Sequence, residues 1–371
     1  MIAHLPNHFS NPDNSFVLIN HPFSNEIHIA FAKNEEIELI ADLNALNNKE
    51  GFVFAPFNTK VNKTYLLPQS KQFKIPKNKF EQLLENQLQN IKLKLKCSDD
   101  KALIYNNLTE EKYLTQIANT IALINNEEIN KVVFTKTIVK KLKADANPLQ
   151  VFNLLVNDYE SACCYFVKIK NEIWLGASPE TLVSYDNKYL KTMALAGTLP
   201  KDKAESNEYK WSKKEFEEHY FVSHHIQQKL ESLGLHGSIA VPKTMQAGNL
   251  VHLQTDFNYT SNNNIHSQIG NIVNGLHPTP AVAGTPVNLS LPIIEEMEQY
   301  NRSYYTGFLG FLNQQKGHLF VNLRCMKWQN NEAIIFVGGG ITKDSNPKKE
   351  WEETELKAKT MLLALADSIE E

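Results

Sequence analysis

The spacing of hydrophobic positions changes along this chain, and the changes predict where strands and helices lie. Runs in which apolar residues dominate or alternate with polar ones predict strands, whereas apolar residues three and four positions apart predict amphipathic helices. The predicted strands cover residues 15–19, 27–31, 131–142, 163–170, 173–176, 181–185, 190–193, 318–328 and 333–337. The predicted helices cover residues 76–94, 110–123, 212–233 and 288–299, and a last helix begins at residue 346.

The grouping of these elements predicts the fold class. Strands that gather in blocks, apart from the helices, favour an α+β fold over a doubly wound parallel sheet. The signals are weaker over residues 1–108 than over residues 109–371. We see no internal repeat and no linker, so we expect residues 1–108 to be a β-rich part of the same fold and residues 109–371 to be the catalytic region.

The last predicted helix carries a pair of acids beside its apolar face. Asn346 suits the N-cap and Pro347 the first helical position. Glu350, Glu353 and Lys357 then share one face, because they lie three and seven positions apart. An apolar stripe runs beside that face and consists of Trp351, Ala358, Met361, Leu362 and Leu365. Acids at the edge of a buried surface need a partner such as a cation, since an isolated buried carboxylate is very costly.

The central predicted helix repeats this arrangement. Glu215 and Glu218 fall on the same side of the helical wheel as His219, Val222 and Ile226. Each acid alone could be a buried ion pair or part of a solvated face. Two helices that each present such a pair favour a metal site, and carboxylate oxygens suit Mg²⁺.

Other residues could carry chemistry in the segments between these helices. Glu180 follows a Gly-Ala-Ser-Pro turn between two strands, where a carboxylate can be aimed but is more often exposed. Gly197 and Thr198 lie in a segment that offers backbone N–H groups to a carboxylate, or is simply a strand-ending turn. Arg324 with Tyr305 could hold a carboxylate, although Arg324 alone would more often make a surface salt bridge.

Lys131 needs a special environment to act as a base. It begins a β-rich segment, and a lysine at the start of a strand is usually exposed. A catalytic role requires that it be desolvated and close to a substrate.

Composition excludes several classes of function. With 42% apolar residues, 21% charged residues and a net charge of -3, the chain has no basic footprint for nucleic acid. The cysteines Cys97, Cys163, Cys164 and Cys325 form no C-x-x-C motif, and we expect the adjacent pair to be small apolar strand residues. No apolar run approaches the ~20 residues of a membrane span, and the first residues lack the basic region and apolar core that we would expect of a signal peptide. We therefore expect a cytoplasmic protein with no membrane or nucleic-acid partner.

Taken in order, these segments resemble the chorismate-utilising enzymes, the group that contains isochorismate, salicylate, anthranilate and aminodeoxychorismate synthases. The resemblance covers residues 109–366. It is carried by residues 131–133, 176–180, 195–198, 212–219, 252–253, 277–286, 305–310, 324, 338–341 and 345–357. It implies a single α+β domain in which two large antiparallel sheets enclose the active site, with helices outside, and dependence on Mg²⁺.

The resemblance also implies a role for each matching residue. Lys131 would be the general base and Glu180 the general acid. Glu218 and Glu353 would bind the metal directly, while Glu215 and Glu350 would hold metal-bound waters. The ring carboxylate of chorismate and its enolpyruvyl carboxylate would be held by residues among Gly197, Thr198, His252, Ala281, Tyr305, Arg324, Gly338, Gly340 and Lys357.

Within the family, a few positions favour an isochorismate synthase, in which water adds to ring carbon 2 and the 4-hydroxyl leaves. Lys131 matches the water-using members, whereas the ammonia-using ones typically have glutamine there. Ala196 stands where some aminodeoxychorismate synthases have a nucleophilic lysine, and Ala281 stands where salicylate synthases often have threonine. The alternatives are a salicylate or anthranilate synthase, a chorismate-binding protein without turnover, and an unrelated Mg²⁺-dependent hydrolase. We expect a monomer whose product feeds menaquinone or siderophore synthesis.

Two segments depart from the family pattern. The first catalytic-region strand contains Thr135-Lys136 where a small residue or serine followed by arginine is usual. Leu199-Pro200-Lys201 follows the Gly-Thr segment where an arginine-bearing segment is usual.

Overall fold

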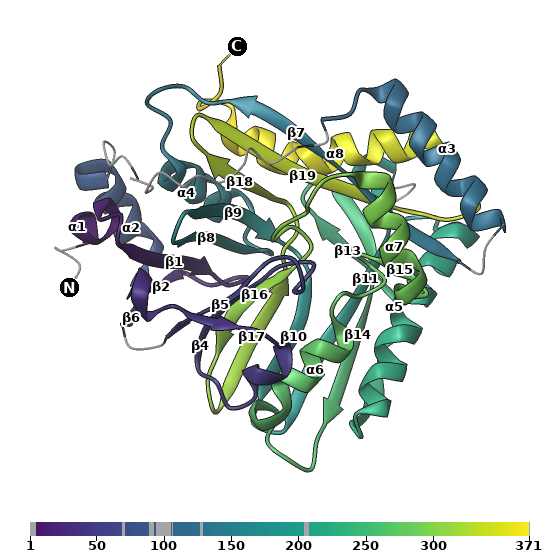
Figure 1. The fold of residues 1–371 in the computed structure, drawn as a ribbon, viewed down its shortest axis with the longest axis horizontal. Coiled ribbons are helices and arrows are strands. Elements are labelled where there is room, and N and C mark those ends of the chain that lie inside the picture. Colours follow the sequence, from purple (N-terminus) through teal and green to yellow (C-terminus); the bar gives the residue numbers. More distant parts are fainter. Residues whose placement is uncertain are drawn as a thin grey trace.

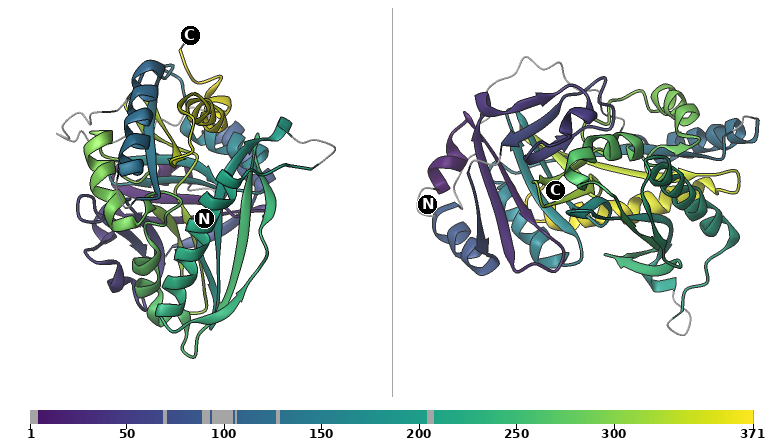
Figure 2. Two further views of the ribbon diagram at one scale, coloured as in Figure 1. Left: turned by 90° about the vertical axis from the view of Figure 1, so that its right-hand side faces the viewer. Right: turned by 90° about the horizontal axis from the view of Figure 1, so that it is seen from below.

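Two antiparallel β-sheets face each other in the middle of the molecule, and helices cover their outer sides (Figures 1 and 2). The computed structural model describes residues 5–68, 71–88, 93, 105, 107–126, 129–203 and 208–370. Over these residues the fold is α+β with two large antiparallel sheets, which confirms the predicted fold class.

The first sheet has nine strands within the described residues. In spatial order they are β15 (Gly284–Thr285), β7 (Lys131–Lys141), β19 (Glu332–Ile341), β18 (Cys325–Gln329), β9 (Glu172–Ser178), β8 (Cys163–Ile169), β1 (Asn14–Asn20), β2 (Glu26–Lys33) and β6 (Gln72–Pro76). The last two strands of the chain, β18 and β19, thus lie between β9 and β7.

The second sheet has ten strands within the same described residues. In spatial order they are β12 (His236–Ile239), β14 (Leu250–Thr260), β11 (Tyr189–Pro200), β10 (Thr181–Asp186), β17 (Lys316–Val321), β16 (Phe308–Leu312), β4 (Gly51–Ala55), β5 (Thr64–Pro68) and β3 (Glu38–Ile40), and β13 (Lys243–Ala247) also pairs with β14. Strands that precede residue 108 therefore take part in both sheets.

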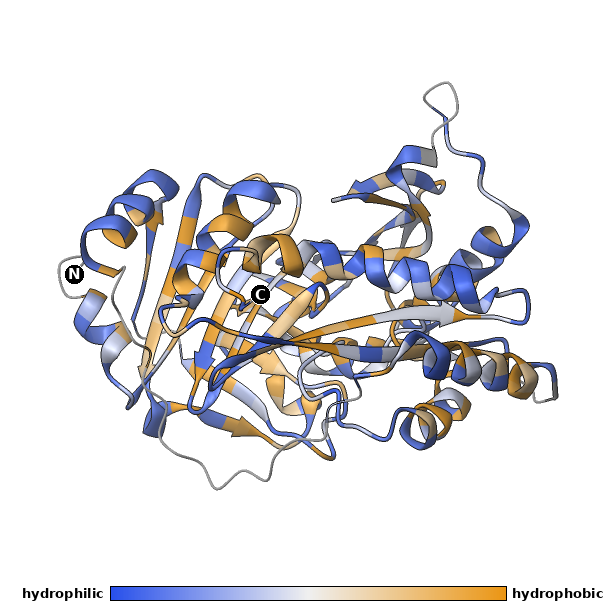
Figure 3. Cartoon of the chain, turned by 90° about the horizontal axis from the view of Figure 1, so that it is seen from above, coloured by the Kyte–Doolittle hydropathy of each residue, from blue (hydrophilic) through white to orange (hydrophobic). Residues whose placement is uncertain are grey.

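The helices divide between the outer faces of the two sheets. They are α1 (Leu5–Ser10), α2 (Lys77–Leu83), α3 (Glu110–Asn126), α4 (Pro148–Asp158), α5 (Lys213–Ser232), α6 (Ile269–Leu276), α7 (Val287–Glu298) and α8 (Pro347–Leu365). Residues of α1, α2, α4 and α8 pack on the first sheet, and residues of α5 and α6 pack on the second. Figure 3 shows the polar outer helices around the apolar strands.

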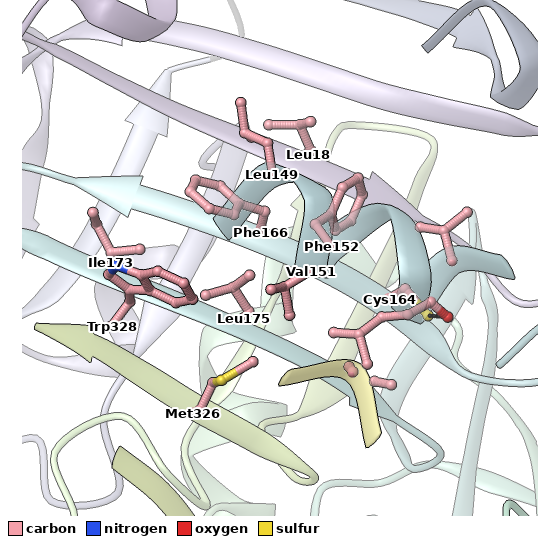
Figure 4. Close-up of a cluster of buried hydrophobic side chains, with 14 of the residues drawn as sticks. Leu18, Leu149, Val151, Phe152, Cys164, Phe166, Ile173, Leu175, Met326 and Trp328 are labelled. Atoms are coloured by element: carbon pink, nitrogen blue, oxygen red, sulfur yellow. Dashed lines mark hydrogen bonds between the residues drawn. The ribbon is translucent and has the colours of Figure 1, made fainter. Parts of the chain in front are cut away.

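Alternation along the strands builds three apolar layers. In β8, Cys163 and Tyr165 face the space between the sheets, whereas Cys164 and Phe166 face the helices outside the first sheet. Figure 4 shows that outer layer, where Phe152 of α4 lies over the strands. Both cysteines are buried strand residues, as expected, and Cys97 lies outside the described residues.

Helix α8 begins where its sequence predicts. The Asn346 side chain accepts a hydrogen bond from the Lys349 backbone N–H at 3.1 Å, and Pro347 occupies the first turn. The predicted helices at 110–123, 212–233 and 288–299 are likewise present as α3, α5 and α7. The helix predicted at 76–94 is shorter: α2 ends at Leu83 and one π-helical turn follows, while residues 89–92 and 94 lie outside the described residues.

The strand predicted at 318–328 is wrong, because the chain changes sheet within it. β17 ends at Val321 in the second sheet and β18 begins at Cys325 in the first. Between them Arg324 has a left-handed φ of 46°, and the Asn322 side chain donates to the Tyr304 carbonyl at 2.8 Å. Both β17 and β18 are buried, so apolar residues continue from one strand into the next and the sequence does not show the break.

Three successive glycines usually indicate a turn, but Gly338–Ile341 do not form one. These residues complete β19 and pair with β7 in register, with Gly338 opposite Thr135 and Gly340 opposite Val133. The strand expected at 190–193 is longer, since β11 continues through the Gly-Thr segment to Pro200 with a register shift between Ala196 and Thr198. Helices α4 and α6 and strands β3–β5 and β12–β14 were not predicted.

Candidate active site

A pocket opens where both sheets and two of the outer helices meet. It holds about 690 Å³ of empty space, counting the part open to solvent. Its lining includes Val133, Pro179, Glu180, Leu195, Ala196, Gly197, Thr198, Glu218, His252, Ala281, Val282, Tyr305, Thr306, Leu323, Arg324, Phe336, Val337, Gly338, Gly339, Gly340 and Lys357.

The pocket gathers most of the predicted site residues. All of them line it except Lys131, Glu215, Glu350 and Glu353. The two segments that depart from the family pattern, residues 135–136 and 199–201, are not among the lining residues. The Lys136 ammonium instead lies 3.1 Å from the centre of the Trp351 ring and 2.6 Å from Glu355. These departures therefore lie outside the pocket.

Lys131 is buried and paired. It is the first residue of β7, and only 1% of its surface is exposed. Its ammonium lies 2.9 Å from Glu218 Oε1 of α5. A Cβ on Gly340 would lie 2.5 Å from Lys131 Cε and would also collide with the Glu218 carboxylate. Only glycine at this position of β19 therefore leaves room for the lysine–glutamate pair.

Glu180 is a buried carboxyl that holds its proton at neutral pH. It lies between β9 and β10, where the strand turn fixes its backbone, and 3% of its surface is exposed. Burial raises the pKa of Glu180 to about 8, although the charges of Lys131 and Lys357 act in the opposite direction. A protonated carboxyl facing a pocket can donate a proton to a leaving group.

The acids of α5 and α8 each have a partner. Glu350 Oε1 lies 2.6 Å from the Lys214 ammonium, and Glu353 Oε1 lies 2.6 Å from the Lys357 ammonium one turn along α8. Glu215 takes part in the capping box of α5 and accepts a hydrogen bond from the Ser212 backbone N–H at 2.9 Å. For the two acids of α8, the partner cations expected from the sequence are therefore the ammonium groups of Lys214 and Lys357.

The two acids of α8 titrate differently. Burial, together with the charge of Glu353, raises the pKa of Glu350 to about 7 against the pull of Lys214. Burial also opposes the ionisation of Glu353, but Lys357 and Lys214 hold its pKa below the usual value. Two carboxyls three residues apart therefore share a crowded, partly ionised site.

The donor chemistry of this cluster fits a magnesium ion. As arranged, no three His, Cys, Asp or Glu side chains among the described residues lie close enough to hold a metal ion. The carboxylates nevertheless converge on two neighbouring glycines of β19. A Cβ on Gly339 would lie 3.3 Å from Glu350 Oε2 and 3.9 Å from Glu353 Oε1, and one on Gly340 would meet Glu218. Carboxylate oxygens of this kind are the ligands that a hard cation such as Mg²⁺ prefers.

A cationic end of the pocket suits a carboxylate. Arg324 Nη2 lies 3.4 Å from His252 Nε2, and Arg324 Nη1 donates to Thr360 Oγ1 at 3.3 Å. Burial and the neighbouring Arg324 lower the pKa of His252 to about 3, so its ring is neutral. His252 Nδ1 lies 3.1 Å from the Gly197 carbonyl, which leaves Nε2 to accept from the guanidinium. These neutral partners orient the Arg324 guanidinium without neutralising its charge. The charge therefore remains available to pair with a carboxylate of a ligand.

Gly197 has a conformation that suits a backbone cradle. Its φ is 78°, and the pairing of β11 with β14 shifts register around it. A Cβ there would lie 3.2 Å from the Glu215 backbone carbonyl, so α5 approaches the bulge closely. The bulge therefore brings Thr198 and the start of α5 to the same side of the pocket.

Some residues of the site were not found from the sequence. Lys214, the partner of Glu350, and Thr360, the partner of Arg324, were not identified. A usable signal existed for both. Lys214 precedes Glu218 by four residues, and Thr360 follows Lys357 by three, so each lies on the same helix face as an identified residue.

Known proteins share this chain's sequence and fold. Isochorismate synthase EntC of Escherichia coli strain K12 is 28% identical over 256 residues, which cover 66% of this chain and 65% of EntC. The match thus spans just under two thirds of that relative. The vibriobactin-specific isochorismate synthase of Vibrio cholerae is 24% identical over 365 residues, covering 93% of this chain and 87% of the relative.

Solved structures show the same fold. A putative 2,3-dihydroxybenzoate-specific isochorismate synthase, DhbC from Bacillus anthracis, superposes with a TM-score of 0.77 at 21% identity, covering 98% of this chain and 99% of that one. Anthranilate synthase component I from Streptococcus pneumoniae gives a TM-score of 0.68 at 19% identity, covering 94% and 92%. The family described as chorismate binding enzymes matches residues 38–366. With its pocket, its two sheets and this match over most of its length, the chain belongs to the chorismate binding enzyme family.

Proposed function

We propose that this chain is an isochorismate synthase that converts chorismate to isochorismate with Mg²⁺. The observation that carries the proposal is the pair of Glu180 and Lys131. A carboxyl whose pKa burial raises to about 8 lines the pocket, and a buried lysine lies close enough for its charge to act on that carboxyl. The reaction needs an acid and a base in one water-poor site.

The cationic groups of the pocket match the two carboxylates of chorismate. Arg324 and Tyr305, with the Gly340 backbone, would hold the enolpyruvyl carboxylate. Lys357 and the Gly197–Thr198 bulge would hold the ring carboxylate. A bound Mg²⁺ would neutralise and orient that carboxylate, with Glu218 and Glu353 as direct ligands and Glu215 and Glu350 behind bound waters.

The chemical step is one substitution with a shift of double bonds. Lys131 takes a proton from a water molecule as the water oxygen bonds to ring carbon 2. The ring double bonds move, and the bond between carbon 4 and its hydroxyl oxygen breaks. Glu180 gives its proton to that oxygen, which leaves as water. In the reverse direction the same two residues exchange roles.

The ion pair of Lys131 defines the inactive arrangement. The Lys131 ammonium lies 2.9 Å from Glu218 Oε1. A lysine that acts as a base must be the free amine, so Glu218 must turn from Lys131 in the competent site. The same turn is the one that its proposed role at the metal requires.

Two alanines support isomerisation over two sister activities. Ala196 and Ala281 both line the pocket, at the positions where some aminodeoxychorismate synthases have a nucleophilic lysine and salicylate synthases often have threonine. Relatives named isochorismate synthase in Escherichia coli and Vibrio cholerae are consistent with this choice.

One relative is specific for vibriobactin and a solved relative is described as menaquinone-specific, so we propose that the product feeds one of these two kinds of pathway in the cytoplasm. None of the described helices is long and apolar enough to cross a membrane. The monomeric state stays a prediction.

One incubation tests the proposal. The purified protein is mixed with chorismate, Mg²⁺ and ammonium, and the products are separated by chromatography, with the Lys131→Ala protein as the control. We expect isochorismate in equilibrium with chorismate and no pyruvate. Salicylate with an equal amount of pyruvate would make the chain a salicylate synthase, anthranilate would make it an anthranilate synthase, and unchanged chorismate would leave only binding.

A further inference from the structure

One ammonium group in the acid cluster has no task in the proposed reaction. Lys214 lies in the first turn of α5, and its Nζ is 2.6 Å from Glu350 Oε1 of α8. The Glu350 side chain is 2% exposed, and the lysine side chain is 23% exposed. The charges of Glu350, Glu218 and Glu353 all act on Lys214. It therefore lies among three of the four acids proposed to bind the metal.

The neighbouring lysines differ from Lys214 in this respect. Lys131 and Lys357 also pair with acids of the cluster, but both are proposed to act on the substrate. Lys213, the preceding residue, has a side chain that is 89% exposed and pairs with Glu217 on the outer face of α5. Lys214 is thus a cation at the metal-binding acids with no other role that the pocket assigns to it.

We propose that Lys214 is a resident counter-ion of the acid cluster that competes with Mg²⁺ for Glu350. This inference rests on the proposed metal site. In the metal-free protein the ammonium bridges α5 and α8 and offsets the repulsion between Glu350 and Glu353. A divalent cation takes over that neutralisation, and Lys214 then withdraws toward solvent, which its partial exposure permits. The Lys214–Glu350 ion pair would thus hold the acid cluster together in the absence of metal. The same ion pair would lower the affinity of the cluster for Mg²⁺.

A purely structural bridge predicts the opposite result. If Lys214 served only to position Glu350 for the metal, its removal would weaken Mg²⁺ binding, because the carboxylate would lose its orientation. If it competes, its removal strengthens binding, because the metal no longer displaces a charge-assisted hydrogen bond. The sign of the change in affinity therefore separates the two roles.

The first experiment measures the binding of Mg²⁺ alone by titration calorimetry. The variants are Lys214→Met, which keeps the aliphatic stem, and Lys213→Met as a matched control from the same helical turn. We expect Lys214→Met to bind Mg²⁺ about tenfold more tightly than wild type, the scale of one close charge pair. Its melting temperature should be lower than that of wild type in chelator and should rise further when Mg²⁺ is added. Lys213→Met should match wild type in both measurements.

A second experiment uses the wild-type chain and does not depend on the folding of a variant. Lysines are acetylated briefly with a hydroxysuccinimide ester, with MgCl₂ or with NaCl of equal ionic strength, and labelling is read by mass spectrometry of peptides. We expect Mg²⁺ to increase labelling of Lys214 and to leave that of Lys213 unchanged. Equal labelling of Lys214 in both salts, or unchanged or weaker Mg²⁺ binding by a folded Lys214→Met protein, would overturn the proposal. Neither readout uses turnover, so the identity of the reaction is tested separately.

Discussion

At the scale of single residues, the proton on Glu180 sets the pH range of the proposed reaction. The general acid must be protonated when the substrate binds, and burial raises its pKa to about 8. We expect kcat/KM to fall as the pH rises through about 8, because the free enzyme then loses this proton. A pH–rate profile measures the fall, and a profile that stays level to pH 9.5 would contradict the assignment of Glu180.

The same pKa shift predicts a change in stability with pH. The pKa of Glu180 is about 8 in the folded chain and has the ordinary value of 4.5 in the unfolded chain, so folding favours the protonated form. This contribution is complete below pH 4.5 and is lost as the pH rises toward 8. Denaturant unfolding at several pH values should show a decline in wild type over that range which is smaller in Glu180→Gln.

Removal of either member of the acid–base pair tests the chemistry directly. We expect Lys131→Ala and Glu180→Gln each to lower turnover by about 10²-fold or more, the usual scale for a lost general base or acid. Lys136→Met is the matched control, since Lys136 is an equally buried lysine of β7 that lies outside the pocket. That variant should unfold more easily yet turn over normally. Near-normal turnover by Lys131→Ala would remove its role as base.

At the scale of elements, β19 is the surface over which α5 and α8 bring their acids together. Gly340→Ala should displace the Lys131–Glu218 pair, because the new Cβ would lie 2.5 Å from Lys131 Cε. Both clashing groups are ends of flexible side chains, so we expect the melting temperature to change little and turnover to fall by about 10²-fold. Gly339→Ala should do less damage, since its nearest atom would lie 3.3 Å away. Equal effects of the two changes would argue against this view of β19.

The acid face of α8 carries a prediction about metal dependence. Glu353→Gln should abolish Mg²⁺-dependent turnover while the fold remains, because removal of one charge from a crowded acid cluster relieves repulsion. Glu352→Gln, one residue earlier on the exposed side of α8, should leave turnover unchanged. Circular dichroism and an assay over a range of MgCl₂ concentrations measure both effects. Full wild-type turnover in excess chelator would disprove the metal assignment.

Elements with local signals could be predicted, and elements set by distant contacts could not. Asn346 and Pro347 indicate the start of α8, because capping depends only on residues that are close in sequence. The break between β17 and β18 has no such signal, because both strands are apolar and only the partners of Asn322 and Arg324 define it. Successive glycines usually indicate a turn, whereas here Gly339 and Gly340 make room for side chains from two helices.

At the scale of the whole molecule, one buried ion pair joins the segments around the pocket. Arg302 Nη2 lies 2.6 Å from Glu298 Oε1, and the same guanidinium donates to the carbonyls of Val133 and Val282 at 2.8 Å. Glu298 Oε1 also accepts from the Thr135 backbone N–H at 2.8 Å. The pair thereby fixes α7, β7 and the loop that contains Val282 relative to one another.

Loss of this pair should destabilise the entire fold. Arg302→Leu leaves Glu298 as a buried charge without its cation, and we expect the free energy of unfolding to fall by about 3–5 kcal/mol. Chemical denaturation measures this, with Lys348→Leu, which removes the cation of a surface pair with Glu110, as the control. A loss below about 1 kcal/mol, the usual ceiling for an exposed pair, would show that water reaches Glu298.

The identities of the site residues followed from the sequence better than their pairing did. Eleven of the pocket's lining residues were predicted as site residues from their order along the chain, because the resemblance extends over most of it. That Lys131 meets Glu218, and that Lys214 meets Glu350, depends on how α5 and α8 approach β19 from different directions. No local sequence pattern indicates how α5 and α8 approach β19.

The position of β18 and β19 between β9 and β7 has a consequence for the order of synthesis. During translation, β7 and β9 are synthesised long before β18 and β19, the two strands that lie between them in the sheet. The facing edges of β7 and β9 have no strand to pair with during that time. Lys357, which lines the pocket, emerges later still. Sheet closure by such distant segments is intrinsically slow. The facing edges of β7 and β9 therefore stay open to wrong pairing until β18 and β19 are synthesised, and the pocket is complete only once Lys357 follows them.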